Sequence, residues 1–171
     1  IKESAESFAD EFTARAVAAY EGGENFVISP ISVYSALAMA AECADGSTRE
    51  EILAAMNTDY ELLRSDFLNL YRSVLRDTKT AKAVLGNSVW VGEGIPVKQT
   101  GVDSLAENYG AYSYSADFAY DNEEANEAVR HFVKEQTNGL IDRAFELSED
   151  TFFPLINQLY LQANWHQHGA K

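Results

Sequence analysis

Residues 25–41, which read NFVISPISVYSALAMAA, contain the pattern that decides the fold. The segment Asn25-Phe26-Val27-Ile28 predicts a short strand. Ser29 followed by Pro30 then predicts the start of a helix, because serine is a favoured N-cap and proline a favoured first helical residue. The helix expected over residues 31–44 is crowded with serine and alanine, whose small side chains let another backbone pack close to the helix axis. We therefore predict that this helix is buried.

Helical periodicity extends from this segment in both directions. Upstream, the apolar spacing predicts an amphipathic helix over residues 4–20, ended by a Gly-Gly pair. Downstream, two overlapping capping boxes in the sequence STREE predict a short helix over residues 47–56, and an apolar stripe predicts a longer helix over residues 60–75. The first half of the chain is therefore expected to be mainly helical.

The second half alternates between extended and helical patterns. Strands are expected over residues 83–92 and 111–118, with one long strand over 151–165, whereas helices are expected over 96–109 and 123–137. No repeat, linker or low-complexity segment interrupts the sequence. We therefore expect one structural unit of the α+β class.

Charge and hydropathy exclude two kinds of partner. The 171 residues carry a formal net charge of −14, and binding to nucleic acid draws its free energy from Lys and Arg, so no nucleic-acid partner is expected. No apolar run approaches the roughly 20 residues needed to cross a bilayer, so we expect no membrane span and no membrane partner. Residues 1–4 lack the apolar core of a signal peptide, so any such segment is removed or was never present.

Few side chains could carry catalysis or bind a metal. Cys43, the single cysteine, lies in an apolar stretch and is predicted to be a buried small side chain, since nothing near it in sequence would stabilise a thiolate. His166 and His168 alternate at the end of the chain, but a metal would need further ligands, and His131 lies far away in the sequence. No hydrolase, phosphate-binding or paired-cysteine motif occurs, so we expect no enzyme, no metal and no cofactor.

Two blocks of sequence occur in a characteristic order. The first joins residues 25–39 to Gly46-Ser-Thr-Arg-Glu-Glu-Ile52, and the second comprises Asn126, Phe132-Val133, Thr137-Asn-Gly-Leu-Ile141, Asp150-Thr151, Leu155-Ile-Asn157, Tyr160 and Trp165. Together they resemble the serpin family of serine protease inhibitors. The resemblance implies the N-terminal portion of the serpin fold, helices A to F with strands of the large central sheet. It also implies that residues 1–171 form a single serpin domain, incomplete at the C-terminus because the reactive loop region is absent.

The resemblance also implies a function. The complete protein would inhibit serine or cysteine proteases as a suicide substrate, by inserting its reactive loop into the central sheet. Its partners would be the target protease, bound through the missing reactive loop, and the C-terminal remainder of the same serpin. An alternative is a non-inhibitory serpin that acts as a carrier or chaperone, which would keep the same N-terminal half. We expect an extracellular or secreted protein.

Site residues are implied by the same resemblance. The shutter beneath the sheet would comprise Ser29, Pro30, Ser32 and Asn157, the breach where insertion begins would hold Trp165, and the packing of helix F across the front would involve Phe132 and Val133. The residues alone allow a simpler interpretation, in which these are an ordinary helix start, a ladder residue and core aromatics. With the resemblance, we favour the shutter and the breach.

Four positions depart from the family pattern. Glu42 and Cys43 replace a pair that is usually Gly-Ala, and Gln158 and Ala163 occupy positions that are commonly Ala and Gly. These departures bear on local packing and leave the resemblance intact.

Three cations, Arg72, Arg76 and Lys79, are spaced to share a face of the fourth helix, the element with which some serpins bind sulfated polysaccharides. Asp66 and Asp77 dilute their charge. Because three cations at helical spacing usually form a solvated face, we prefer that interpretation to a polysaccharide site.

Overall fold

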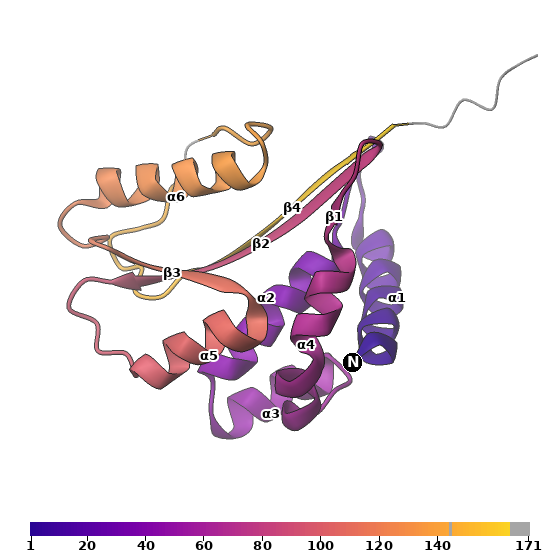
Figure 1. Cartoon of the computed structure of the whole chain (residues 1–171), viewed down its shortest axis with the longest axis horizontal. Coiled ribbons are helices and arrows are strands. Elements are labelled where there is room, and N and C mark those ends of the chain that lie inside the picture. Colours follow the sequence, from indigo (N-terminus) through magenta and orange to yellow (C-terminus); the bar gives the residue numbers. More distant parts are fainter. Residues whose placement is uncertain (144, 165–171) are drawn as a thin grey trace, which may run out of the picture.

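β2 (Ala81–Gly92) is the strand on which the rest of the sheet is assembled. The computed structural model describes residues 1–143 and 145–164. Most of the helices lie on one side of the sheet and α6 lies on the other (Figure 1). In chain order the elements are α1 (Lys2–Ala19), α2 (Pro30–Cys43), α3 (Gly46–Ala55), α4 (Tyr60–Val74), β1 (Arg76–Asp77), β2, α5 (Gln99–Tyr109), β3 (Ala111–Ala116), α6 (Asn122–Gln136) and β4 (Leu155–Ala163).

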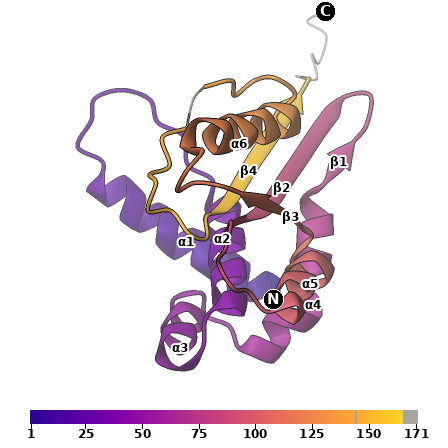
Figure 2. The same ribbon diagram turned by 90° about the vertical axis from the view of Figure 1, so that its left-hand side faces the viewer.

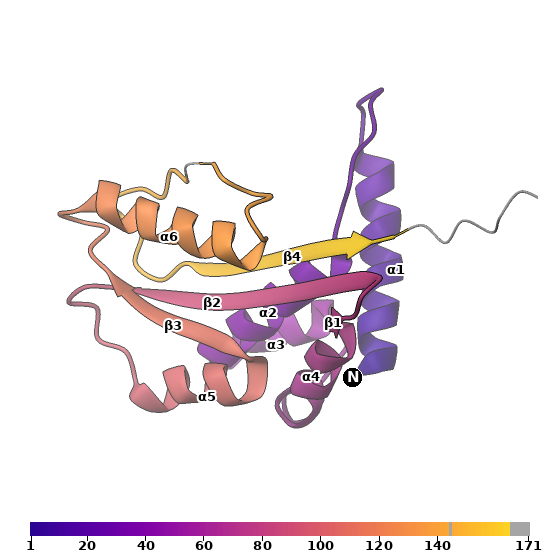
Figure 3. The same cartoon turned by 45° about the horizontal axis from the view of Figure 1, so that its top comes forward.

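Both edges of β2 are paired. Along one edge, residues 87–92 pair in parallel with β3, and the two residues of the short β1 pair antiparallel near the other end. Along the opposite edge, residues 81–89 pair antiparallel with the whole of β4. Within the described part of the chain, β3 and β4 therefore lie on opposite sides of β2, as Figure 3 shows.

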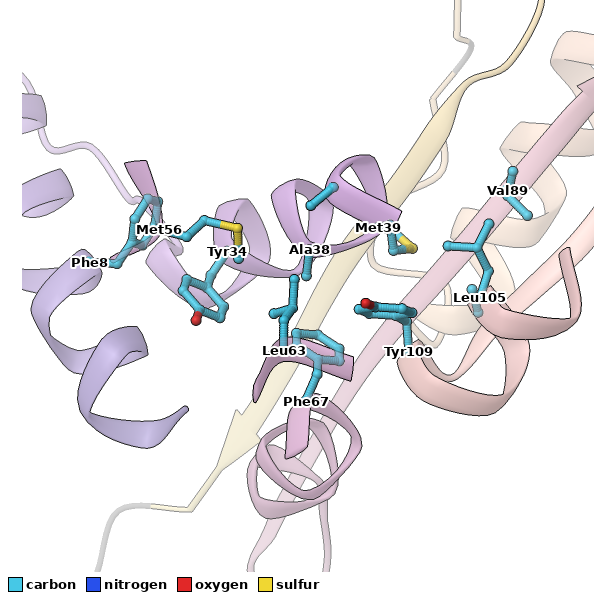
Figure 4. Close-up of a cluster of buried hydrophobic side chains, with 12 residues drawn as sticks. Phe8, Tyr34, Ala38, Met39, Met56, Leu63, Phe67, Val89, Leu105 and Tyr109 are labelled. Carbon is cyan, nitrogen blue, oxygen red and sulfur yellow. The ribbon is translucent and has the colours of Figure 1, made fainter. Parts of the chain in front are cut away.

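The back face of the sheet, on which Val89 and Leu155 lie, packs against the layer formed by α1–α5. α2 runs through the middle of this layer and packs against β4, α1, α3 and α5. Figure 4 shows the resulting cluster of buried side chains, in which Phe8, Tyr34, Ala38, Met39, Met56, Leu63, Phe67, Val89, Leu105 and Tyr109 are labelled. The small residues of α2 let these elements approach it closely, which confirms the prediction of a buried helix.

The front face of the sheet, on which Trp90 and Ile156 lie, is covered, within the described part of the chain, by α6 (Figure 2) and by the segment that follows it. Ile141, Phe145 and Leu147 of that segment pack against the front cluster. The cluster here is smaller and consists of Trp90, Ala116, Phe118, Ala125, Val129, Phe132 and Val133, with Ile156 packed beside it. α6 begins with the Asp121 side chain accepting the Glu124 N–H, an N-cap that satisfies one of the four free donors of a helix start.

The α+β class and the type of most elements are as predicted. No helix among the described residues is both long and apolar enough to cross a membrane.

The strand predicted at residues 25–28 does not form. A strand needs a neighbour that completes its ladder of backbone hydrogen bonds, and no described residue pairs with this segment. Val27 is 96% exposed. The segment is an extended lead into α2.

Three further predictions need correction. α3 starts at Gly46 rather than within the STREE sequence, because the Asp45 side chain accepts the Gly46 N–H at 2.9 Å. β4 starts at Leu155 rather than at residue 151, because Pro154 has no N–H to donate, although its carbonyl accepts the Trp90 N–H at 3.0 Å. Cys43 is exposed rather than buried, since it is the last residue of α2.

Candidate functional site

The outer edge of β4 is the candidate site. Among the described strands, β4 pairs only with β2. The N–H groups of Trp90 and Gly92 donate to the carbonyls of Pro154 and Phe152, at 3.0 and 2.9 Å. Because antiparallel strands exchange such bonds at every second residue, the even-numbered residues of β4 bond to β2. The backbone groups of the odd-numbered residues, 155 to 161, therefore point to the outer edge.

A relay of side-chain hydrogen bonds crosses the back of the sheet at the middle of β4. Asn157 Nδ2 donates to Asn87 Oδ1 at 2.6 Å, and Asn87 Nδ2 donates to the Tyr109 carbonyl at 2.8 Å. Asn87 is fully buried, so both of these hydrogen bonds lie inside the protein. Asn157 Oδ1 is also buried, yet it has no hydrogen-bond partner in the described part of the chain. The relay thus ends at Asn157 Oδ1, a buried acceptor to which no described residue donates.

The start of α2 holds the other predicted shutter residues. Ser29 is the N-cap and its Oγ lies 2.8 Å from Ser32 Oγ, while Pro30 occupies the first helical turn. α2 packs against β4, so both groups of residues belong to the back layer. Within residues 1–143 and 145–164, no hydrogen bond joins Ser29 or Ser32 to Asn157.

Phe132 and Val133 are buried between α6 and the sheet, in the front cluster. Phe132 meets the ring of Trp90 edge-on, with ring centroids 6.0 Å apart. Trp165 lies outside the described residues.

Gln158 is a buried polar residue whose environment the sequence analysis did not anticipate. It is 6% exposed and lies on the front face, and neither its Nε2 nor its Oε1 has a partner among the described residues. Opposite it on β2 is Gly86, where a Cβ would come within 2.1 Å of Gln158 Nε2. The glycine is therefore required by the close approach of the amide. Alternation along β4 could have predicted a buried front-facing amide at this position.

Glu42 is a second residue whose role was missed. Its carboxylate, whose side chain is 6% exposed, accepts hydrogen bonds from Ser104 Oγ at 2.5 Å and from the Tyr109 hydroxyl at 3.0 Å, and pairs with Arg64 at 3.5 Å. Burial and the nearby Glu42 charge raise the pKa of Tyr109 well above its usual range. The carboxylate ties α2 to α4 and α5, a link that a small residue at this position could not make.

The rival hypotheses find little support in the described residues. They hold no group of three or more potential metal ligands, and His131 is exposed, 3.8 Å from Glu135; His166 and His168 lie outside them. The three cations do not share a helix face, because α4 ends at Val74 and Arg76 binds the Ser73 and Leu75 carbonyls.

Comparisons with known proteins point to one family. The family described as "Serpin (serine protease inhibitor)" matches residues 3–168. The putative serpin-Z12 of Oryza sativa is 34% identical over 163 residues, which is 92% of this chain and 38% of that relative. The alpha-1-antiproteinase of Rattus norvegicus is 27% identical over 147 residues, 82% of this chain and 36% of that relative. The chain thus spans less than two fifths of these relatives.

Solved structures agree on the fold. Arabidopsis AtSerpin1, in its native stressed conformation, superimposes with a TM-score of 0.82 at 24% identity, over 95% of this chain and 43% of that one. Reactive loop cleaved human thyroxine binding globulin superimposes with a TM-score of 0.81 at 22% identity, over 96% of this chain and 50% of that one.

Proposed function

This chain belongs to the serpin family, and from that membership we propose that it is the receiving half of a protease trap. In this proposal a C-terminal remainder completes a single serpin domain around residues 1–171. The remainder carries a reactive loop that a serine or cysteine protease cleaves, and the cleaved loop then enters the sheet beside β4. The target protease is the partner, and the intact protein acts outside the cell as an inhibitor rather than as an enzyme.

The observation that carries the proposal is the outer edge of β4. A strand can be added to a sheet where a row of backbone donors and acceptors lies open, and the odd-numbered residues 155 to 161 offer a row that no described residue pairs with. The strand is already fixed along its other edge by nine residue pairs with β2. Addition to the outer edge can therefore proceed without breaking the existing ladder.

The predicted shutter residues have chemistry that suits a sheet which opens. No described residue donates to the buried Asn157 Oδ1, and a buried acceptor costs free energy while it is unpaired, so a donor brought by a neighbouring strand would stabilise the completed sheet. Ser29, Pro30 and Ser32 form a small, internally bonded helix start that leaves few groups to be unpaired when β4 moves. We assign Phe132 and Val133 to holding α6 across the front, and keep Trp165 as a breach residue by resemblance.

The two solved structures support a frame that keeps its shape. One is a native stressed form and the other is a form with a cleaved reactive loop, and this chain superimposes on both almost equally, with TM-scores of 0.82 and 0.81. A receiving half is expected to fit both forms, because the loop is the part that relocates.

A non-inhibitory carrier or chaperone is the second candidate. Structures titled thyroxine-binding globulin in complex with thyroxine also match, with a TM-score of 0.81 over 97% of the chain in one case. The same N-terminal half would serve such a protein.

An inhibition assay separates the two candidates. Full-length protein is mixed with a panel of serine and cysteine proteases and run on a denaturing gel. The trap predicts a complex that survives denaturation with at least one protease, and a gain in thermal stability when the loop is cleaved. Simple digestion by every protease, with no gain in stability, favours the carrier.

A matched pair of variants ties the result to β4. The Leu161 N–H points to the outer edge and the residue is 67% exposed, so Leu161→Pro removes a donor for the incoming strand and leaves the bonds to β2 intact. We expect this variant to be cleaved as a substrate with little complex formed, whereas Leu161→Ala should trap the protease normally. Equal trapping by both variants would count against insertion beside β4.

A further inference from the structure

A groove lies at the opposite edge of the sheet, between β3 and α6. It has a volume of about 470 Å³ and is lined by Trp90, Tyr114 and Phe132, together with residues along one side of α6. β2 separates β3 from β4, so the groove lies across the sheet from the edge at which the proposed trap accepts a strand. The groove is therefore separate from the edge at which the trap is proposed to act.

The floor of the groove is built from aromatic rings in fixed positions. Tyr114 stacks on Trp90 with ring centroids 4.4 Å apart, and Phe132 meets Tyr114 edge-on at 5.5 Å. Trp90 is held by its own Nε1, which donates to Ser88 Oγ at 3.0 Å. Tyr114 remains 37% exposed and its neighbour Tyr112 53% exposed. The outermost ring thus offers π surface to a ligand.

The walls of the groove are acidic. An adjoining pocket of about 310 Å³ shares Ser115, Glu124 and Ala128 with it, and among the described residues no Lys or Arg lines either pocket. Six carboxylates line the two pockets: Glu93, Asp117, Asp121, Glu124, Glu127 and Glu135.

Only part of this charge is neutralised within the described residues. Glu127 pairs with Arg130, and Glu135 lies 3.8 Å from His131, a partner that is charged only when protonated. Glu124 has no ion pair there. The pKa of Tyr114 is raised by burial, by Tyr112 and by the nearby Glu135 carboxylate, so Glu135 lies close enough to act on a ligand at that ring.

An aromatic floor with acidic walls matches one kind of ligand chemistry. A cation over an aromatic ring is attracted by the ring quadrupole, and nearby carboxylates add to the attraction. The two adjoining pockets form an elongated site, which suits several residues of an extended chain better than a single small ion. We propose that this groove binds an extended basic segment of a protein partner, with one arginine or lysine side chain over Tyr114.

A peptide titration of the full-length protein tests the proposal. The probe is a fluorescein-labelled peptide with four Arg-Ser repeats, and the control is the same peptide with citrulline, an uncharged isostere, in place of arginine. We expect the arginine peptide to bind at least about tenfold more tightly than the citrulline peptide, by fluorescence anisotropy at low salt, because desolvated cation–π contacts and carboxylates act only on the cation. Raising the ionic strength should weaken the arginine peptide selectively.

Variants locate the binding site. Tyr114→Ser should weaken binding by about 3- to 30-fold, the range of a cation–π contact, whereas Tyr114→Phe keeps the ring and should bind normally. Glu124→Gln with Glu135→Gln should weaken binding by a similar factor without altering the fold. The matched control neutralises Glu50 and Glu51, two exposed carboxylates of α3, and should leave affinity unchanged.

Three results would overturn the proposal. The first is equal affinity for the arginine and citrulline peptides. The second is an unchanged affinity in the Glu124 and Glu135 double variant. The third is an equal loss of affinity in the Glu50 and Glu51 control, which would mean that the peptide is attracted by net charge alone. The glutamine substitutions decide the matter even if Tyr114→Ser fails to fold.

Discussion

The two faces of the sheet are held in different ways. The back face is covered by α1–α5 with a large apolar cluster. The polar groups of Asn87 and Glu42 are paired within this layer, although Asn157 Oδ1 and the Tyr34 hydroxyl have no partner among the described residues. The front face is covered by one described helix, α6, and by the segment after it, over a smaller cluster, and it contains the Gln158 amide without a partner in the described part of the chain. The back is built to stay closed, whereas the front is the weaker contact.

This difference suits the proposed trap. A strand that enters beside β4 must displace whatever lies across the sheet, and a weakly held helix can shift at little cost. The helical layer behind the sheet must meanwhile hold β2 and β4 in register. In full-length protein, substitutions in the back layer and on the front face should therefore differ in their effects.

The largest expected effect is at the centre of the back cluster. Phe67 is fully buried and its ring packs at a tilt against that of Tyr109, with centroids 5.2 Å apart. Phe67→Ala should therefore lower the free energy of unfolding by about 3 to 5 kcal/mol, measured by denaturant titration. Phe132→Ala, its counterpart on the front, should mainly speed hydrogen exchange in α6. If Phe132→Ala lowers global stability equally and leaves α6 exchange unchanged, the two faces are not separable.

The next effect is a pH dependence of the back layer. Burial raises the pKa of the Tyr34 hydroxyl from its usual value near 10 to about 12. Between pH 10 and 12 the folded protein therefore keeps the Tyr34 proton, whereas the unfolded chain loses it. The stability that depends on the neutral hydroxyl is fully present below pH 10 and is lost as the pH rises to about 12. The difference between wild type and Tyr34→Phe should amount to about 2 to 3 kcal/mol across that window. Parallel stability curves for the two proteins would contradict this.

Glu42→Ala should cost about 2 kcal/mol, because it leaves the Tyr109 hydroxyl and Ser104 without their acceptor. Glu42→Gln keeps one oxygen acceptor and should lose less. In a double-mutant cycle, adding Tyr109→Phe to Glu42→Ala should recover part of the loss, since one orphaned hydroxyl is removed. Strict additivity would mean that the carboxylate does not tie α2 to α5.

The smallest effect has the opposite sign. Gln158→Met replaces a buried amide that has no partner among residues 1–143 and 145–164 by an apolar chain of similar length. We expect a gain of about 1 kcal/mol together with slower exchange in α6. In the proposed trap, a tighter α6 should also reduce the yield of protease complex. A loss of stability would show that the amide has a partner and that the front is better held than we infer.

Whether a segment forms a helix or a strand could be predicted from local patterns, whereas the pairing of the strands in the sheet could not. Ser29 and Pro30 mark the start of α2, and the period of apolar residues separates β2 from α6, because these signals lie within a few residues of each other. The strand at residues 25–28 failed because its formation depends on a distant neighbour, which local sequence does not identify.

The candidate site also depends on contacts between distant residues, which local sequence does not identify. Asn157 and Ser29 were found by resemblance, but the pairing of Asn157 with Asn87 depends on the register of β4 against β2. Glu42 and Gln158 were noticed only as departures from the family. Their roles depend on which elements surround them, and that information is spread over α4, α5 and α6.

The pairing of Asn87 with Asn157 joins residues 70 positions apart, and it has a consequence during translation. At about 5 to 20 residues per second, the ribosome takes roughly 4 to 14 s to deliver Asn157 after Asn87 has emerged. Over that interval β2 lacks β4, while α1–α4 have already been made. We therefore expect the nascent chain to assemble its helical layer first, and molecular chaperones to bind it at β2 until β4 arrives.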